Sequence, residues 1–199
     1  MTAAPTLMAG YDRPMPLSLI DGVAGEIEAA SADDRQRREW LAVAKDPASI
    51  TRAGIPSHFT ASALPVTADA TRVCLVLHRR MGLWVQPGGH FEPEDQSVVA
   101  AARREMVEET GLSGEVEPRP LLLSRHRAPC GVGDWHLDLQ MLVVLNESAP
   151  FVSDESLDVA WFDVSDLPAE RAPGVAGLVA KAVTRLNESE LRGAGSRPE

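Results

Sequence analysis

One stretch of the sequence, GGHFEPEDQSVVAAARREMVEETGL (Gly88–Leu112), constrains the fold more than any other. Its second half reads as a helix that ends just before a glycine, and it carries Glu105, Glu108 and Glu109. Helical geometry places the last two within about 60° of Glu105 around the helix axis. Like charges on one face repel, and the C-terminal end of a helix is unfavourable for anions. The three carboxylates therefore require a compensating cation.

The glycines upstream of this helix indicate what kind of cation it is. Gly88 and Gly89 follow Pro87, and a backbone without side chains can bring its carbonyl groups close to a ligand. Carboxylates together with a backbone carbonyl are oxygen ligands of the kind that Mg²⁺ and Mn²⁺ prefer. The pattern favours a divalent-metal site over a solvated acidic surface.

The order of the predicted elements indicates an α+β fold, with a mixed sheet between helices in an α/β/α sandwich. An apolar seam of Val99, Ala102 and Met106 predicts the side of the central helix that packs on the sheet. Strands are predicted at 71–79, 82–89, 116–127, 136–145 and 159–167, and a final helix at 174–188.

The N-terminal part predicts an extension made of a helical pair over residues 17–46. Ile20, Val23 and Ile27 recur at helical spacing, and Ser31 is the expected N-cap of the second helix. We expect this pair to pack on the main domain as a structural element, with a lid or a homodimer surface as the alternatives. The predicted division is 1–55 for an N-terminal arm and helical extension, 56–190 for the main domain and 191–199 for a disordered tail.

Composition limits the partners of the chain. Its 29 acidic and 19 Lys and Arg residues give a net charge of −10, which disfavours DNA binding because that affinity comes from neutralising phosphates.

The two cysteines, Cys74 and Cys130, form no CxxC pair, so a disulfide framework is not expected. No signal peptide and no membrane-spanning run is expected. We predict a cytoplasmic protein with a small phosphorylated molecule as its partner.

The glutamate-rich stretch resembles the Nudix box. That motif is Gly, five residues, Glu, seven residues, Arg-Glu, an aliphatic residue, one residue, Glu-Glu, one residue, Gly and an aliphatic residue. Here Gly89 matches the opening glycine, and REMVEETGL (Arg104–Leu112) matches the second half without a gap. The box covers about an eighth of the chain, and the order of the flanking strands extends the likeness to residues 58–190.

Two departures from the box concern its first half. Asp95 stands where the family has Glu, and eight residues rather than seven separate it from Arg104. Glu105 fixes the register, so the extra residue falls in the loop or the first helical turn. In the family this position supports the loop and often pairs with the motif arginine, and Asp has a shorter reach than Glu.

The resemblance implies the Nudix fold and a divalent-metal-dependent hydrolase of a nucleoside diphosphate-linked, or similar pyrophosphate, small molecule. It implies that Glu105, Glu108, Glu109 and the Gly89 carbonyl bind Mg²⁺ or Mn²⁺, and that Arg104 orients the carboxylates. Two alternatives remain. One is a non-catalytic Nudix-fold module that senses a nucleotide, and the other is an isopentenyl-diphosphate isomerase, which needs a reactive cysteine.

Other polar residues are candidates for the rest of the site. Glu155 is the candidate general base, with Asp154 and Asp158 as alternatives, and His90 and Trp84 are the candidate substrate-binding residues. Four further histidines and one aspartate either line the pocket or are satisfied within the sheet: His58, His78, His126, His136 and Asp138.

Overall fold

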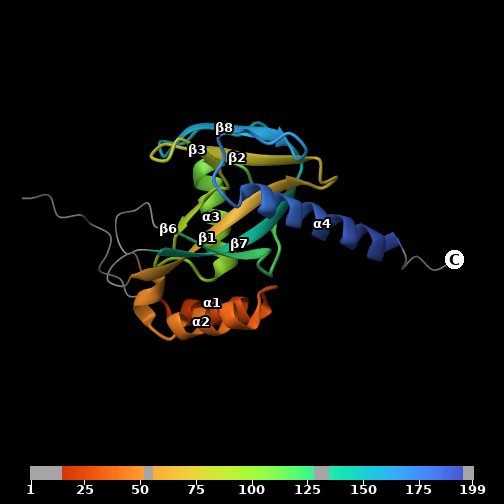
Figure 1. Cartoon of the computed structure of the whole chain (residues 1–199). Helices are drawn as coiled ribbons and strands as arrows, with labels where there is room; N and C mark the ends of the chain where they lie inside the picture. Colours follow the sequence, from red (N-terminus) through yellow and green to blue (C-terminus); the bar gives the residue numbers. More distant parts are fainter. Residues whose placement is uncertain (1–14, 52–55, 128–134, 195–199) are drawn as a thin grey trace, which may run out of the picture.

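A mixed sheet with helices on both faces forms the framework of the chain (Figure 1). The computed structural model describes residues 15–51, 56–127 and 135–194. The strands are β1 (Ser57–Thr67), β2 (Arg72–His78), β3 (Leu83–Val85), β4 (Gly88–His90), β5 (Glu115–Val116), β6 (Leu122–Arg127), β7 (Trp135–Leu145) and β8 (Ser156–Asp163). The helices are α1 (Leu17–Ala29), α2 (Asp34–Ala44), the short 3-10 helix η1 (Pro47–Ile50), α3 (Val98–Thr110) and α4 (Val175–Ala194). The predicted α/β/α sandwich with an N-terminal helical extension is confirmed.

The long parallel pair of β1 and β7 lies at the centre of the sheet. The main path through the strands is β3-β2-β1-β7-β5, with β4 paired to β1, β6 to β7 and β8 to β2, all antiparallel except β1 with β7. The sequence did not predict β1. Its middle consists of Ala61, Ser62 and Ala63 with Pro65 close behind, which lacks the β-branched residues that mark a strand.

The strand predicted at 82–89 is divided into β3 and β4, and the one predicted at 159–167 is β8, which begins and ends earlier. Three other differences from the predicted elements concern β5 and β6, the start of α2 and the end of α4. The strand predicted at 116–127 is divided into β5 and β6, because Pro118 and Pro120 between them cannot donate a backbone hydrogen bond. The N-cap of α2 is Asp33 rather than Ser31, since the Asp33 carboxylate accepts from the Gln36 N–H at 2.8 Å. Helix α4 continues to Ala194, four residues into the tail predicted from 191.

Two predictions fall on residues that the structure does not describe. The N-terminal arm, which precedes residue 15, lies outside the described residues, and so does the tail beyond Ala194. Among the described helices, none is both long and apolar enough to cross a membrane.

Two apolar clusters fill the two sides of the sheet. On one side the inner residues of β1 and β7 pack with α3 and with the α1–α2 pair, which lies below the sheet in Figure 1. Ala102 and Met106 of the predicted α3 seam are fully buried there, while Val99 is only partly buried and Val98 takes its place. On the other side α4 covers the second cluster. The helical extension therefore shares one core with the central helix.

This shared core predicts the effect of shortening a side chain of α1. Ile27 is fully buried in the cluster that also contains Met106 of α3, so Ile27→Ala should lower the free energy of unfolding of the whole chain by about 2–5 kcal/mol. Urea unfolding followed by far-UV circular dichroism measures this. Leu17→Ala, at a position 74% exposed, should change little. A separate early transition confined to the helical pair would contradict the shared core.

Candidate active site

The last two turns of α3 bring the three glutamates to the short strand β4. Ser97 caps the helix start by accepting from the Ala100 N–H at 3.0 Å, and Gly111 ends it with a φ of 68°. The exposed fraction is 12% for the Glu105 side chain and 55% for Glu108, and Glu109 is 6% exposed. The carboxylates are gathered at one place, and two of them are largely removed from solvent.

The Arg104 side chain donates hydrogen bonds both to glutamates of its own helix and to the backbone of β4. Its Nη1 donates to Glu105 Oε1 and to Glu108 Oε2, both at 3.0 Å. Its Nη2 donates at 2.8 Å to the His90 carbonyl oxygen, which ties the helix to β4. A guanidinium is suited to such a role because its planar fork of donors can serve several oxygens at once.

Asp95 is a further hydrogen-bond acceptor for the Arg104 side chain. Its carboxylate accepts from Arg104 Nε at 3.1 Å and from Nη2 at 2.9 Å, and it also accepts from the Glu92 N–H at 2.8 Å. The shorter side chain thus reaches both the arginine and its own loop. The residue inserted after Asp95 lies ahead of or within the first turn of α3, so it leaves the glutamates in place.

Glu109 differs from its neighbours because it makes no contact with Arg104. The Gly88 N–H donates to its carboxylate, but Oε2 is buried and has no hydrogen-bond partner among the residues that the structure describes. Burial, followed by the charges of Glu105 and Glu155, raises the pKa of Glu109 to about 8. Burial also raises the pKa of Glu105 to about 7, with Arg104 opposing that shift. An unsatisfied buried carboxylate oxygen is costly unless a cation or a proton joins it.

Glu155 is the predicted residue that approaches this cluster from another part of the chain. It stands just before β8, and its charge contributes to the raised pKa of both Glu105 and Glu109. Of the alternatives, the Asp158 carboxylate accepts from the Val159 N–H, and the backbone carbonyl of Asp154 accepts from Arg79 Nε. Among the three candidates, Glu155 is the one whose charge acts on both buried glutamates of α3.

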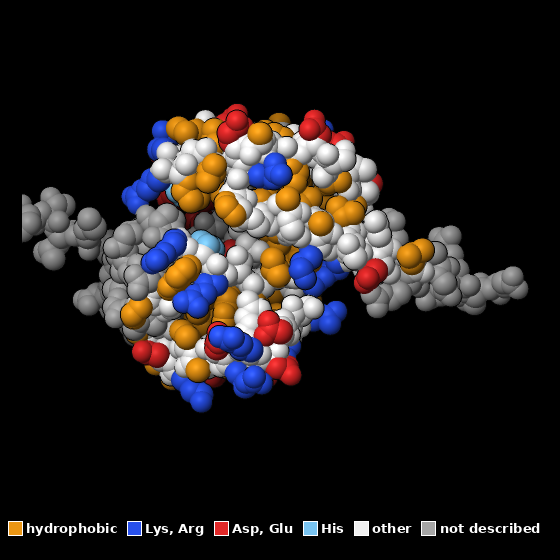
Figure 2. All heavy atoms as spheres, in the orientation of Figure 1, with side chains coloured by type: hydrophobic (Ala, Val, Ile, Leu, Met, Phe, Trp, Pro, Cys, Tyr) orange, Lys and Arg blue, Asp and Glu red, His pale blue; other side chains and the backbone are white. Residues whose placement is uncertain are grey.

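The two faces of β4 are next to different kinds of side chain, carboxylates on one and a histidine on the other, as expected for alternating residues of a strand. A Cβ on Gly89 would lie 2.5 Å from Glu105 Oε1, so Gly89 faces the carboxylates of α3. His90 faces the other way, and its Nε2 lies 3.1 Å from Nε2 of His58 on β1. Figure 2 shows histidine atoms inside a hollow on this side of the molecule.

The sheet surface beside His90 carries a row of buried polar side chains, which we call the polar floor. Its members alternate along the central strands: His58, Thr60 and Ser62 of β1, and His136, Asp138 and Gln140 of β7. Asp138 accepts from the Ser62 hydroxyl at 2.8 Å, from Thr60 at 3.1 Å and from Gln140 at 3.1 Å. The sequence predicted His58, His136 and Asp138 as candidates and missed the other three, although HLDLQ alternates polar and apolar residues in β7.

Other predicted residues have partners outside the glutamates of α3. Trp84 packs edge-on against Phe162, with ring centroids 4.7 Å apart, beside the apolar cluster under α4. His78 accepts from the backbone N–H groups of Arg80 and Met81. Cys74 is fully buried, and Cys130 lies outside the described residues.

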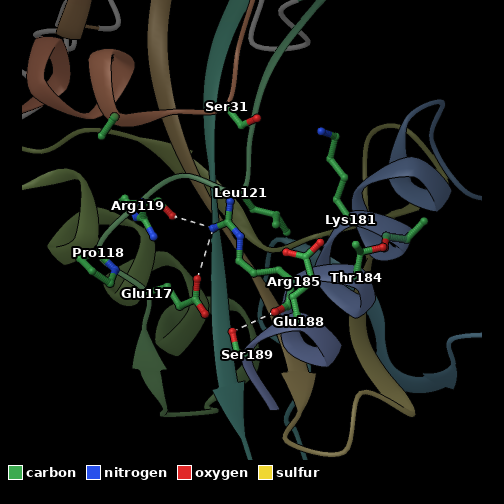
Figure 3. A pocket seen from close by; sticks show the side chains of 12 residues that line it. Ser31, Glu117, Pro118, Arg119, Leu121, Lys181, Thr184, Arg185, Glu188 and Ser189 are labelled. Atoms are coloured by element: carbon green, nitrogen blue, oxygen red, sulfur yellow. Dashed lines mark hydrogen bonds and ion pairs between the residues drawn. The ribbon is translucent and has the colours of Figure 1, made fainter. Parts of the chain in front are cut away.

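A separate open hollow lies between the end of α1, the segment 117–121 and α4 (Figure 3). Arg185 of α4 crosses it and donates to the Glu117 carboxylate and to the carbonyl oxygens of Arg119 and Pro120, each at 3.2 Å. None of the predicted site residues lines this hollow. The contacts of Arg185 thus link α4 to the segment that connects β5 and β6.

Comparison with known proteins identifies the family. The NUDIX domain family matches residues 56–182, which is more than half of the chain. The chain belongs to the NUDIX domain family. Among NUDIX relatives, human nucleoside diphosphate-linked moiety X motif 6 is 31% identical over 120 residues, a match that covers 57% of this chain. The match spans only 37% of the length of that human protein.

Solved NUDIX structures share the fold. The NUDIX domain of Shewanella oneidensis NrtR, complexed with ADP-ribose, is 24% identical with a TM-score of 0.54, and the match covers 64% of this chain and 87% of that chain. The E. coli dihydroneopterin triphosphate pyrophosphohydrolase is 17% identical with a TM-score of 0.53, covering 64% and 95%. At these identities the likeness shows the fold alone.

The two glycines of the NUDIX domain should respond differently to an added methyl group. A Cβ on Gly88 would lie 2.6 Å from the Ser62 Cα, a backbone atom that cannot yield, so Gly88→Ala should cost about 1–3 kcal/mol of stability. A Cβ on Gly89 meets the end of the Glu105 side chain, which can move, so Gly89→Ala should cost less. Urea unfolding of both variants tests this, and equal losses would contradict it.

The raised pKa values predict how stability depends on pH in protein kept metal-free with a chelator. The folded state holds protons on Glu105 and Glu109 that the unfolded chain, with pKa 4.5, releases earlier. Stability is therefore fully present below the unfolded pKa and is lost as pH rises through the folded values near 7 and 8.

The variant Glu109→Gln removes one of the two titrating groups. Its stability should therefore fall less steeply with pH than that of the wild type, with a difference in slope of at most about 1.4 kcal/mol per pH unit. Thermal unfolding between about pH 5 and pH 8 measures the slope. Glu115→Gln, at an exposed position on β5, should leave it unchanged. A stability that rises over this interval would show that the two carboxyl groups are not held in their protonated form.

Proposed function

We propose that the chain is a divalent-metal-dependent hydrolase that cleaves a phosphoanhydride bond in a nucleoside diphosphate-linked, or similar pyrophosphate, small molecule. The observation that carries the proposal is the buried Oε2 of Glu109, which lacks a partner among the described residues and lies in a group of three glutamates beside Gly88 and Gly89. Such a carboxylate group is an oxygen donor set that hard cations require.

The residues present fit Mg²⁺ or Mn²⁺. Glu105, Glu108 and Glu109 would hold the ion, with the Gly89 carbonyl as the backbone ligand. The absence of a side chain at Gly89 lets the Glu105 carboxylate come close to this backbone. When bound, the ion supplies charge neutralisation for the oxygens of a pyrophosphate group. It would also offset the burial and the carboxylate repulsion that together raise the pKa of Glu109.

The remaining roles follow from the contacts of each side chain. Arg104 positions Glu105 and Glu108 through its Nη1 and fixes β4 through its Nη2. Glu155 acts as the general base that takes a proton from the attacking water, because its carboxylate lies near Glu105 and Glu109. His90 contacts the substrate, while stacking of a base on Trp84 stays a prediction.

The substrate class is supported by the relatives as their names describe them. The Shewanella domain was solved with ADP-ribose, and the E. coli structure is a dihydroneopterin triphosphate pyrophosphohydrolase. ADP-ribose and dihydroneopterin triphosphate, the compounds in these two names, each contain a phosphoanhydride attached to a larger organic group. The cytoplasmic location and the domain limits at 56 and 190 remain predictions.

The alternatives are less well supported by the site. An isomerase of isopentenyl diphosphate needs a reactive cysteine. Cys74 is fully buried and burial raises its pKa to about 12, which suppresses the reactive thiolate, so this activity would have to use Cys130, which lies outside the described residues. A non-catalytic sensing module usually lacks one of the box glutamates, and all three are present here. Binding of a nucleotide without cleavage would support the sensing module.

The substrate is found with purified full-length chain, Mg²⁺ or Mn²⁺, and a panel of nucleoside triphosphates, ADP-ribose, nucleotide sugars and dinucleotides. Phosphate-containing products are separated by chromatography. Cleavage that stops when the divalent cation is chelated supports the proposal. Failure to cleave any compound on the panel with either metal counts against it.

The variant Glu109→Gln tests the role of the central carboxylate. It keeps the size of the side chain but removes the charge that would bind the cation, so kcat should fall on the order of 10³-fold. Glu115→Gln makes the same chemical change on an exposed strand residue and should retain wild-type kcat. Full activity in Glu109→Gln would exclude this assignment.

A further inference from the structure

Three histidines from three strands converge on the polar floor. His58, His90 and His136 each offer a ring nitrogen, and these three atoms lie within 4.8 Å of one another. Their ring centroids are 5.1 Å apart for His58 and His90, 4.8 Å for His58 and His136, and 5.1 Å for His90 and His136. We propose that these residues form a second metal site, for a divalent transition metal of the zinc type, separate from the glutamates of α3.

The sheet fixes the positions of these histidines. His58 and His136 are direct partners in the parallel pair of β1 and β7. His90 of β4 is the partner of Thr60, two residues along β1 from His58, so its side chain projects from the same face. Side chains on rigid strands lose little further freedom when they bind an ion, which favours binding.

The separation of the nitrogen atoms suits a shared ion. At a tetrahedral zinc with Zn–N bonds of about 2.0–2.1 Å, two imidazole nitrogens lie about 3.3–3.4 Å apart. Nε2 of His58 and Nε2 of His90 are 3.1 Å apart, and the third nitrogen is near enough for a small side-chain rotation to bring it into place. Three protein ligands leave a fourth position for water or another ligand.

Ligand chemistry separates this site from the one on α3. Imidazole nitrogen is a good ligand for zinc and its transition-metal neighbours, whereas carboxylate and carbonyl oxygens suit Mg²⁺ and Mn²⁺. The two sites also lie on opposite sides of β4, since Gly89 faces Glu105 and His90 faces His58. Excess Mg²⁺ should therefore occupy the glutamates without displacing a transition metal from the histidines.

Burial is compatible with metal entry. His58 is 1% and His136 7% exposed, but His90 is only half-buried, which leaves the ion a route from solvent. The competing account is a cluster held only by hydrogen bonds and ring contacts, with no affinity for metal. The two accounts differ in a binding measurement.

The experiment is a Zn²⁺ titration of the full chain, in competition with a chromogenic chelator and in excess Mg²⁺. We expect one tightly bound equivalent. His90→Gln, which changes the least buried of the three, and His136→Gln should each weaken binding by at least about 100-fold. His78→Gln makes the same change outside the cluster and should bind Zn²⁺ like the wild type. Glu109→Gln should also retain it.

Co²⁺ provides a second readout that reports the ligands directly. Its visible d–d absorption should appear with the intensity of four- or five-coordinate Co²⁺ in the wild type and be lost in His90→Gln, with circular dichroism confirming that the variant is folded. Wild type that takes up no Zn²⁺ in excess Mg²⁺, or folded His90→Gln and His136→Gln that bind as the wild type does, would overturn the proposal. These outcomes are independent of hydrolysis, so they do not depend on the proposed function.

Discussion

The contacts of one arginine hold the candidate site together. Arg104 is hydrogen-bonded to Asp95 in the loop, to Glu105 and Glu108 on its own helix, and to the carbonyl of His90 on β4. Burial opposes a charge at this position, but the surrounding carboxylates keep the guanidinium protonated. Arg104 therefore offsets only part of the repulsion among the carboxylates of α3. Arg104 donates to two of the three glutamates, and Oε2 of the third, Glu109, has no hydrogen-bond partner among the described residues.

The three residues of β4 lie between the glutamates of α3 on one face and histidines of the sheet on the other. Its glycine side allows a carboxylate of α3 to approach the backbone, and its histidine side joins the polar floor of β1 and β7. The Asp138 carboxylate within that floor accepts hydrogen bonds from two hydroxyl groups and one amide group. The three residues of β4 therefore border the glutamates of α3 on one face and the polar floor on the other.

The parts of the site that could be predicted from the sequence are those set by local geometry. Helical periodicity alone places Glu105, Glu108 and Glu109 together, and the resemblance identified Arg104 and Gly89. The convergence of His58, His90 and His136 could not be predicted, because it depends on the register of three strands. One of these strands, β1, was itself missed, since its small residues give no strand signal.

The same reasoning explains why Glu155 was a candidate among three and not a single prediction. Its nearness to α3 depends on how β8 pairs with β2, a long-range contact that includes a register shift at Leu77 and His78. Likewise the cap of α2 was placed at Ser31 although Asp33 fills that role, because both residue types suit an N-cap. Local patterns identified the elements, and tertiary pairing decided which side chains meet.

The shortness of β4 has a consequence for which changes in chain length the domain can accept. Losing or gaining a single residue within Gly88–His90 would exchange the two faces of the strand, so that an imidazole would collide with Glu105 and a bare backbone would meet His58. The short loop between Asp95 and the start of α3 at Val98 is under no such restriction, because an extra residue there is absorbed before the helix that carries the carboxylates. Natural length variants of this chain should therefore cluster after Asp95 and be absent from β4.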